Sequence, residues 1–269
     1  MNKFLLIQDF IIGICIGSFL NVVIYRLPNN FSIIYPRSFC PKCENQILWY
    51  SNIPILSWLL QNGKCRKCKK EISIKYPIIE LLTGIIFVIF RYASPNYYSG
   101  ELMNFIELLF TWIFLSNLIA ISFIDIDSFW VPQSLINFGF TLGLLNLIYV
   151  EIIDIEMIPA EIFLKGFSGG ISAFITFELL RKFSRFVFRK DALGKGDVKL
   201  VSMIGIWLGP IGVFLGIAIS YVFAAFCILI GFQIGKISRN QIIPFAPFLS
   251  IGAFIVWFFG NDFLLNIIF

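Results

Sequence analysis

Long apolar segments alternate with shorter polar ones along most of the chain. A bilayer core about 30 Å thick requires about 20 apolar residues in a helix that rises about 1.5 Å per residue. Segments that approach this length occur at 4–25, 77–92, 105–124, 132–150, 166–180 and 243–259. We therefore predict a membrane-spanning helix over each of these ranges. The first should be a retained helix rather than a signal peptide, because only Lys3 precedes it.

The segment 200–235 holds 36 residues without a single charge. As one helix it would be about 54 Å long, which is far more than a bilayer needs. Gly209-Pro210-Ile211-Gly212 is the natural place for a reversal, because proline and glycine interrupt helices. We therefore predict two helices here and about eight transmembrane helices in all.

Composition supports a polytopic membrane protein. Of the 269 residues, 58% are hydrophobic and 14% charged, whereas a soluble domain has about 45–50% apolar and about 25% charged residues. The chain has no histidine. This excludes Ser-His and Cys-His nucleophile pairs and histidine-ligated zinc hydrolases.

Positive charge is unevenly distributed along the chain. Of the 21 lysines and arginines, 18 lie in the segments 26–76, 181–199 and 236–241. An eight-helix path with the N-terminus outside puts these three segments on one face, and the positive-inside rule makes that face cytoplasmic. The opposite loops contain acidic residues, namely Glu101, Glu151, Asp154, Glu156 and Glu161. We interpret the basic segments as determinants of topology and lipid contact, and we expect no nucleic-acid binding.

Four of the six cysteines form two Cys-x2-Cys knuckles, Cys40-Pro-Lys-Cys43 and Cys65-Arg-Lys-Cys68, separated by 21 residues. Two tight turns that each supply two thiolates suit a tetrahedral zinc ribbon. In a reducing cytoplasm, disulfides are the weaker interpretation. We predict a structural Zn²⁺ site in a small cytoplasmic zinc-ribbon-like module. The expected division is a first transmembrane helix at 1–26, this module at 27–76, and an all-α membrane core at 77–269.

Two acids border uncharged segments at the predicted cytoplasmic face. Asp125 follows the uncharged run 108–124, and Asp197 precedes the one that begins at Leu200. Ionisable groups near hydrocarbon are costly and suggest function. Two neighbouring carboxylates share one proton, which provides a general base for water and a general acid for a leaving nitrogen. The sequence therefore predicts aspartic-protease chemistry.

Asp127 and the loop 194–196 complete the predicted site. Positions i and i+2 of a helix face different ways, so we favour Asp125 over Asp127, which would be a support or a solvated cap. Gly194 and Gly196, on either side of Lys195, allow close backbone approach and unusual dihedral angles. The alternative is that Asp197 only caps the following helix and that the other two acids lie in a loop at the interface.

The chain resembles the prepilin peptidases, which are type 4 prepilin-like leader peptidases of the Gly-x-Gly-Asp intramembrane aspartyl protease group. The resemblance covers nearly the whole length. It rests on 17–28 (GSFLNVVIYRLP), both cysteine knuckles, 52–58 (NIPILSW), 76–84 (YPIIELLTG), Asp125 with Pro132, 194–200 (GKGDVKL) and 244–248 (PFAPF). Gln133 departs from the usual Asp or Asn after the proline, which affects a contact at the start of a helix. Within 76–84, either Glu80 contacts the leader or the cysteine module, or it is a solvated interfacial carboxylate.

The resemblance implies that Asp125 and Asp197 form the catalytic dyad in a bacterial inner membrane. It also implies cleavage of the basic leader of prepilins or pseudopilins at the cytoplasmic face. Many relatives then methylate the new N-terminal amine with S-adenosylmethionine. Two other functions compete with this one: a zinc-ribbon membrane scaffold for pilus or secretion assembly, and a transporter with a carboxylate proton relay. The transporter fits less well, because a proton relay across the bilayer would need acids at several depths, whereas both predicted acids lie at one face.

Overall fold

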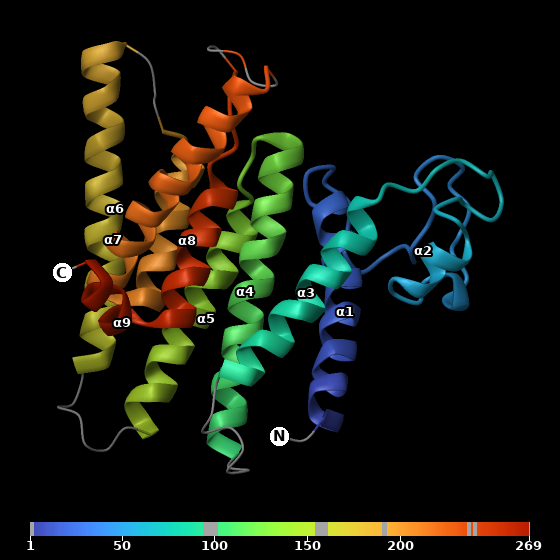
Figure 1. Ribbon diagram of the computed structural model, residues 1–269, viewed down its shortest axis with the longest axis horizontal. Coiled ribbons are helices and arrows are strands. Elements are labelled where there is room, and N and C mark those ends of the chain that lie inside the picture. The colour runs from blue at the N-terminus through green and yellow to red at the C-terminus, as the bar shows by residue number, and fades with distance from the viewer. Residues whose placement is uncertain are drawn as a thin grey trace. The chain divides into compact units, whose positions relative to one another are not determined.

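The computed structural model describes residues 3–93, 102–153, 161–189, 193–235, 238 and 241–268. Within these ranges all regular secondary structure is helical, and the only β-type pairings are isolated bridges (Figure 1). The all-α prediction is therefore confirmed. Several charges used above to predict topology lie outside the described residues: Glu101, Asp154, Glu156, Lys190, Lys236 and Arg239.

The described helices are α1 (Lys3–Arg26), α2 (Leu56–Leu60), α3 (Lys75–Ala93), α4 (Leu102–Ser128), α5 (Gln133–Ile153), α6 (Glu161–Phe188), α7 (Lys195–Gln233), α8 (Ala246–Phe259) and α9 (Asn261–Ile268). A short 3-10 helix, η1, spans Trp49–Ser51. Two compact units divide the chain, at 1–120 and 121–269, so that the boundary falls within α4.

Within the described ranges, five helices are long and apolar enough to cross a membrane: α1, α4, α5, α6 and α7. The pair α8 and α9, bent by 99°, makes a sixth if it is one broken span. This is fewer than the eight helices predicted. Two features account for the difference. Helix α3 is not counted because it carries three charged residues, Lys75, Glu80 and Arg91. Helix α7 is counted once, although the break at Gly209 divides it into two limbs.

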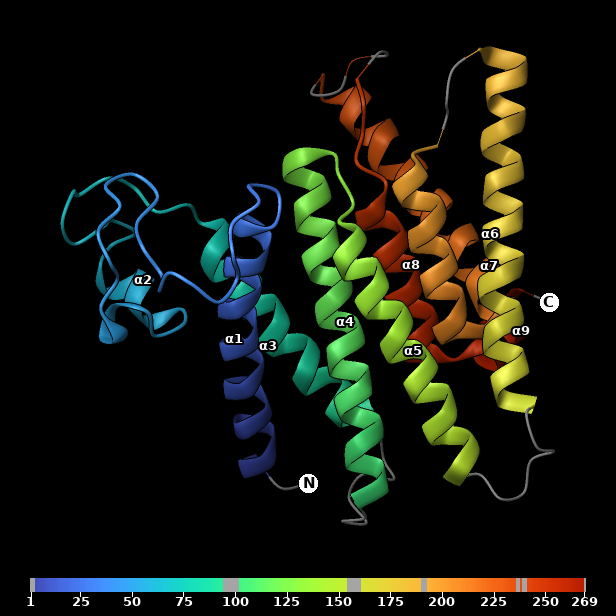
Figure 2. The ribbon, with the colours of Figure 1, turned by 180° about the vertical axis from the view of Figure 1, so that it is seen from behind.

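The break in α7 is at Gly209, whose φ of 71° and ψ of 179° are not helical, and Pro210 follows it. Figures 1 and 2 show that the two limbs of α7 run in opposite directions from this point. A residue with a side chain rarely adopts such a positive φ, so glycine is needed at position 209. The predicted break at Gly209 and Pro210 is confirmed.

In the N-terminal unit, α1 packs directly on α3. A Cβ added to Gly13 would lie 2.7 Å from the Cα of Gly84, and one added to Gly17 would lie 2.6 Å from the Cα of Glu80. Small residues thus let the two backbones touch, as is usual for helices in membranes. Toward the start of α1 and the end of α3, the guanidinium of Arg91 forms a buried, bidentate ion pair with Asp9.

In the C-terminal unit, α7 packs against α5, α6 and α8. The Ser202 hydroxyl donates to the Gly170 carbonyl at 2.9 Å, and the Trp207 indole donates to the Gly139 carbonyl at 3.0 Å. Large apolar side chains on these helices are exposed, among them Val222 and Leu229. An apolar exterior with a packed interior suits a helix bundle in lipid.

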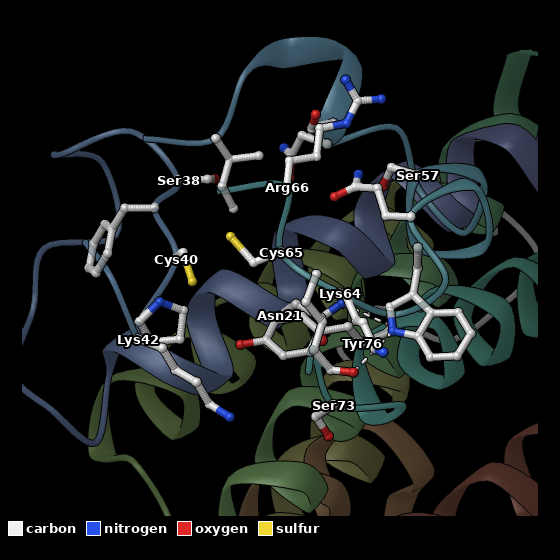
Figure 3. Close-up of a pocket in the computed structure, with 18 of the residues that line it drawn as sticks. Asn21, Ser38, Cys40, Lys42, Ser57, Lys64, Cys65, Arg66, Ser73 and Tyr76 are labelled. Carbon is white, nitrogen blue, oxygen red and sulfur yellow. Dashed lines mark hydrogen bonds between the residues drawn. The ribbon is translucent and has the colours of Figure 1, made fainter. Parts of the chain in front are cut away.

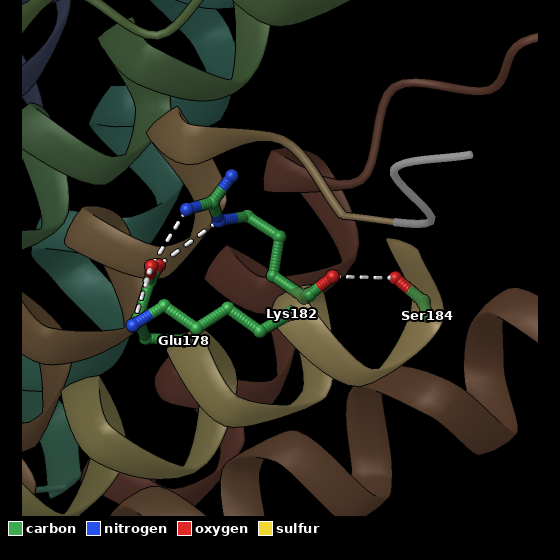
Figure 4. Close-up of polar contacts among 4 residues, drawn as sticks. Glu178, Lys182 and Ser184 are labelled. Atoms are coloured by element: carbon green, nitrogen blue, oxygen red, sulfur yellow. Dashed lines mark hydrogen bonds and ion pairs between the residues drawn. The ribbon is translucent and has the colours of Figure 1, made fainter. Parts of the chain in front are cut away.

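The last turns of α6 carry the basic residues expected at the cytoplasmic face. The Arg181 guanidinium donates two hydrogen bonds of 2.9 and 2.6 Å to the Glu178 carboxylate. Figure 4 shows the Lys182 side chain directed at the same carboxylate, in a longer contact. The Ser184 hydroxyl donates to the Arg181 carbonyl at 2.8 Å. This end of α6 and the start of α7 lie toward the same end of the C-terminal unit (Figure 2).

Candidate active site and metal centre

Asp125 lies in the last turn of α4 and is buried, with 5% of its surface exposed. Its Oδ2 accepts a hydrogen bond of 3.1 Å from the N–H of Ala246, and the N–H of Phe245 also bonds to the carboxyl group. Both donors belong to the start of α8, where backbone N–H groups have no partner within the helix. The positive end of α8 therefore holds the Asp125 carboxylate.

Asp197 lies in the first turn of α7, three residues after the N-cap Gly194, and is half-buried. Its Oδ2 accepts a hydrogen bond of 3.3 Å from the Gly194 N–H, which completes a capping arrangement. Gly194 has φ −69° and ψ 147°, which any residue adopts. The expectation of unusual dihedral angles at Gly194 was therefore wrong.

Close approach does require glycine at position 196. A Cβ on Gly196 would lie 2.9 Å from the Cβ of Val131, in the connection between α4 and α5. The start of α7 is thus pressed against the connection that follows Asp125. Asp125 acts electrostatically on Asp197, and Asp197 acts on Tyr221 in the second limb of α7. The two predicted acids therefore share one region of the C-terminal unit.

The side chains of Asp127 and Lys195 are exposed, in contrast to Asp125. Asp127 lies two residues beyond Asp125 on α4, so the two carboxyl groups leave the helix in different directions. Lys195 is the first residue of α7.

Gln133, the departure from the family pattern, begins α5 and joins it to α7. The ammonium group of Lys199 donates a hydrogen bond to Gln133 Oε1. The other end of the Gln133 amide donates to Asn137 Oδ1 at 2.7 Å. A neutral amide oxygen therefore accepts the hydrogen bond from Lys199, at a position where the family usually has Asp or Asn.

The two cysteine knuckles have matching backbones. In the first, the Cys40 N–H bonds to the Asn45 carbonyl at 2.9 Å, and in the second the Cys65 N–H bonds to the Lys70 carbonyl at 2.9 Å. The residue after each second cysteine has a positive φ, 55° at Glu44 and 57° at Lys69. Each turn therefore directs its two thiols toward one point.

The four sulfur atoms lie within 4.8 Å of one another, and those of Cys40 and Cys68 are 4.0 Å apart. Tetrahedral thiolate ligands at about 2.3 Å from zinc stand at this kind of separation. The cysteines form no disulfide. The cluster Cys40, Cys43, Cys65 and Cys68 therefore fits a zinc-ribbon-like module, as predicted.

The backbone around Cys65 favours a thiolate. The N–H groups of Cys68 and Lys67 bond to its sulfur and lower the pKa of the Cys65 thiol to about 7. Deprotonated sulfur is the form that ligates metal. The donor set is therefore partly prepared for a cation before one binds.

One set of groups in these sites escaped the sequence analysis, and one residue named there, Glu80, is now placed. The donors to Asp125 are backbone N–H groups of Phe245 and Ala246, which no side-chain chemistry reveals; only the match at 244–248 pointed to that segment. Glu80 is buried in the N-terminal unit, where its Oε2 accepts the Ile55 N–H at 2.7 Å. Of the two possibilities left open for Glu80, a contact with the cysteine segment is therefore found.

Family models match two parts of the chain. Residues 11–94 match the bacterial peptidase A24 N-terminal domain, which includes the cysteine knuckles. Residues 112–229 match the type IV leader peptidase family, and this range contains Asp125 and Asp197. No solved structure shows a significant match.

Curated relatives agree with the family models. A prepilin leader peptidase/N-methyltransferase of Myxococcus xanthus is 36% identical over 74% of this chain, an alignment that covers only 55% of the relative. A type 4 prepilin-like proteins leader peptide-processing enzyme of Escherichia coli O78:H11 is 36% identical over 89% of this chain and 88% of its own length. A prepilin leader peptidase/N-methyltransferase of Neisseria gonorrhoeae is 31% identical over 94% of this chain and 89% of its own. The chain belongs to the type IV leader peptidase family.

Proposed function

We propose that this protein is an intramembrane aspartyl endopeptidase that removes the leader of type IV prepilins or pseudopilins. The observation that carries the proposal is that Asp125 and Asp197 lie close enough to influence each other electrostatically, in a chain without histidine. Two such carboxylates hold one proton between them, so that one acts as base and the other as acid. The reaction needs no metal or cofactor at this site.

The hydrogen bonds suggest how the two roles divide. Asp125 accepts bonds from two N–H groups at the start of α8, so it is the better holder of negative charge. Asp125 takes a proton from water, and the oxygen adds to the scissile carbonyl carbon. Asp197 gives its proton to the amide nitrogen as the C–N bond breaks. Gly194, Lys195 and Gly196 position Asp197, and Asp127 is an exposed support.

The proposed substrate has a short basic leader followed by an apolar helix, and it is cut at their junction. A substrate of this kind lies in the lipid and meets the dyad at the cytoplasmic face of the bacterial inner membrane. The basic residues at the end of α6 support that side, because positive residues stay in the cytoplasm. Membrane lipids are the other partners, contacting the exposed apolar side chains.

The second proposed activity is N-methylation of the new N-terminus, with S-adenosylmethionine as methyl donor, in line with the relatives named peptidase/N-methyltransferases. The proposed metal is one Zn²⁺ held by Cys40, Cys43, Cys65 and Cys68. Four protein ligands leave no open coordination position, so this ion would fold the module rather than take part in catalysis.

The test is cleavage of a prepilin-like peptide by the purified, detergent-solubilised protein. Asp125→Asn and Asp197→Asn keep the shape of each side chain but remove its proton chemistry. Each should lower cleavage about 10²- to 10⁴-fold, the usual contribution of general acid–base catalysis. Asp127→Asn is the matched control, because it changes the charge equally two residues away, and it should retain most of the rate.

Full cleavage by either of the first two variants would remove the proposed dyad. Loss of cleavage in Asp127→Asn alone would mean that the wrong acid of α4 had been chosen. A wild-type protein that binds the peptide and never cuts it would favour the scaffold instead.

A further inference from the structure

Two buried serines join α4 to α8 beside the proposed general base. The Ser122 hydroxyl donates a hydrogen bond of 2.8 Å to the Ser250 hydroxyl, which in turn donates to the Ala246 carbonyl at 2.9 Å. Only 9% of the Ser122 surface and 8% of the Ser250 surface are exposed. The peptidase chemistry proposed above makes no use of either hydroxyl.

The spacing of these residues puts the serine pair next to Asp125. Ser122 precedes Asp125 by three residues on α4, and Ser250 follows Ala246 by four residues on α8, so the members of each pair share one face of their helix. The two helices are therefore joined at two successive points of the C-terminal unit. At one point the Asp125 carboxylate accepts the Ala246 N–H at 3.1 Å, and at the other the two hydroxyls meet. A shift of α8 that breaks one link also strains the other.

The start of α8 has few N–H groups to offer, so its placement matters. Pro247 has no N–H, and the Phe248 N–H bonds to the Phe245 carbonyl at 3.1 Å. The N–H groups of Phe245 and Ala246 remain, and both bond to the Asp125 carboxyl group. If α8 moved away from Asp125, no other N–H group of this first turn could take over the negative charge.

The serine link differs in kind from other hydrogen bonds between helices of this protein. The Asn21 amide donates to the Tyr76 carbonyl at 3.1 Å between α1 and α3 (Figure 3), and the Ser202 hydroxyl donates to the Gly170 carbonyl between α7 and α6. A backbone carbonyl is present whichever residue carries it. The link between α4 and α8 instead needs two particular side chains, so one substitution removes it.

We propose that Ser122 and Ser250 are a positioning pair for the peptidase reaction. Their bond holds the first N–H groups of α8 against Asp125 while this carboxylate takes a proton from water. The inference rests on the proposed peptidase function, to which it adds two residues that act through Asp125. Both hydroxyls keep their protons throughout, so the pair affects the rate of the chemical step and leaves peptide binding unchanged.

Kinetic constants separate positioning from simple stabilisation. The full, detergent-solubilised chain is assayed with a fluorogenic prepilin-like peptide. Ser122→Ala should lower kcat about 5- to 50-fold, which is less than the roughly 100-fold cost of moving a reacting group by about 1 Å. KM should change by less than about twofold, because the lost interaction serves the chemical step. Hydrogen–deuterium exchange at the N–H groups of Phe245 and Ala246 should become faster, since a loosened helix start opens more often.

Matched variants separate the hydroxyl from the packing around it. Ser122→Thr keeps the hydroxyl and should retain kcat within about threefold, whereas Ser122→Val has nearly the same shape without the hydroxyl and should lose as much as Ser122→Ala. Ser202→Ala is the control, because it removes a buried bond of 2.9 Å that involves neither α4 nor α8, and it should leave kcat nearly unchanged. Ser122→Ala combined with Ser250→Ala should lose no more than Ser250→Ala alone, because residues that share one interaction are not additive.

Equal kcat values for Ser122→Ala and Ser202→Ala would overturn the proposal, as would equal losses in Ser122→Thr and Ser122→Val. A lower thermal stability of Ser122→Ala with both kinetic constants unchanged would show a merely structural bond. Additive losses in the double variant would show that the two serines act separately. Cleavage that survives Asp125→Asn would instead refute the dyad itself, so a failure of the positioning pair and a failure of the proposed peptidase give different results.

Discussion

Gly196 offers the most direct test of how the catalytic loop is placed. An added methyl group would lie 2.9 Å from the Cβ of Val131, whereas carbon atoms in contact stand about 3.5–4.0 Å apart. The Gly196→Ala variant must therefore separate the start of α7 from the α4–α5 connection by roughly 0.6–1.1 Å. Val131 Cβ is attached to the backbone, so no side-chain rotation relieves the contact.

The same displacement affects stability and activity differently. Overpacking costs about 1–3 kcal/mol, and replacing glycine by alanine within a helix returns about 1 kcal/mol. The net destabilisation of about 0–2 kcal/mol leaves the protein folded. Misplacing a reacting group by about 1 Å costs about 10²-fold in rate. Gly196→Ala should therefore lower kcat/KM for a fluorogenic prepilin peptide about 100-fold, with little change in thermal unfolding.

Matched variants separate crowding from loss of flexibility. Gly194→Ala should lower the rate by less than Gly196→Ala does, because its Cβ would lie 3.0 Å from Asp197 Oδ2 and would shift that carboxylate by a few tenths of an ångström without moving the backbone. Adding Val131→Gly to Gly196→Ala should restore much of the activity, whereas adding Val131→Ala should not, since the Cβ atom remains. Equal losses at Gly194 and Gly196, or no rescue by Val131→Gly, would refute the reasoning.

Three further predictions concern the N-terminal unit. Elemental analysis should find one zinc per chain, and chelation should open 27–76 to protease; a metal-free module that resists protease would contradict a structural role. Immediately after zinc is removed, before 27–76 opens, Cys65 should be alkylated rapidly above pH 7 and progressively more slowly below it, because the folded backbone lowers its pKa from 9.0 to about 7; an unchanged rate from pH 8 to pH 6 would count against this. Asp9→Asn should destabilise the unit by about 3–5 kcal/mol, because it removes the buried carboxylate that the Arg91 guanidinium binds, and the double change Asp9→Leu with Arg91→Met should recover most of that loss in chemical denaturation.

The positions of the helices could be read from the sequence more reliably than their ends. The uncharged run 108–124 lies within α4, and the break at Gly209 was predicted from glycine and proline alone. The prediction at 166–180 was too short, because α6 extends from Glu161 to Phe188. Hydrophobicity reports where lipid ends, whereas a helix continues into water when pairs such as Glu178 with Arg181 support it.

The candidate site could be predicted where it depends on rare side chains. Acids at the edge of apolar runs and cysteines in pairs are conspicuous in a chain with 14% charged residues. The N–H donors of Phe245 and Ala246 could not be found in this way, because every residue except proline carries such a group. The contact of Gly196 with Val131 depends on tertiary approach, which a local pattern does not encode.

Capping and catalysis were alternatives for Asp197 in the sequence, but the hydrogen bonds make them compatible. Asp197 caps α7 through Gly194, and Asp125 occupies the same kind of position at the start of α8. Helix N-termini stabilise negative charge, and they do so most strongly where burial reduces screening by water. The Gly194 bond uses one carboxyl oxygen of Asp197, so the other can meet a water or a peptide nitrogen. A fold that must keep two acids near lipid thus gains from placing each at a helix start, because the N–H groups there hold the charge of Asp125 and fix the orientation of Asp197.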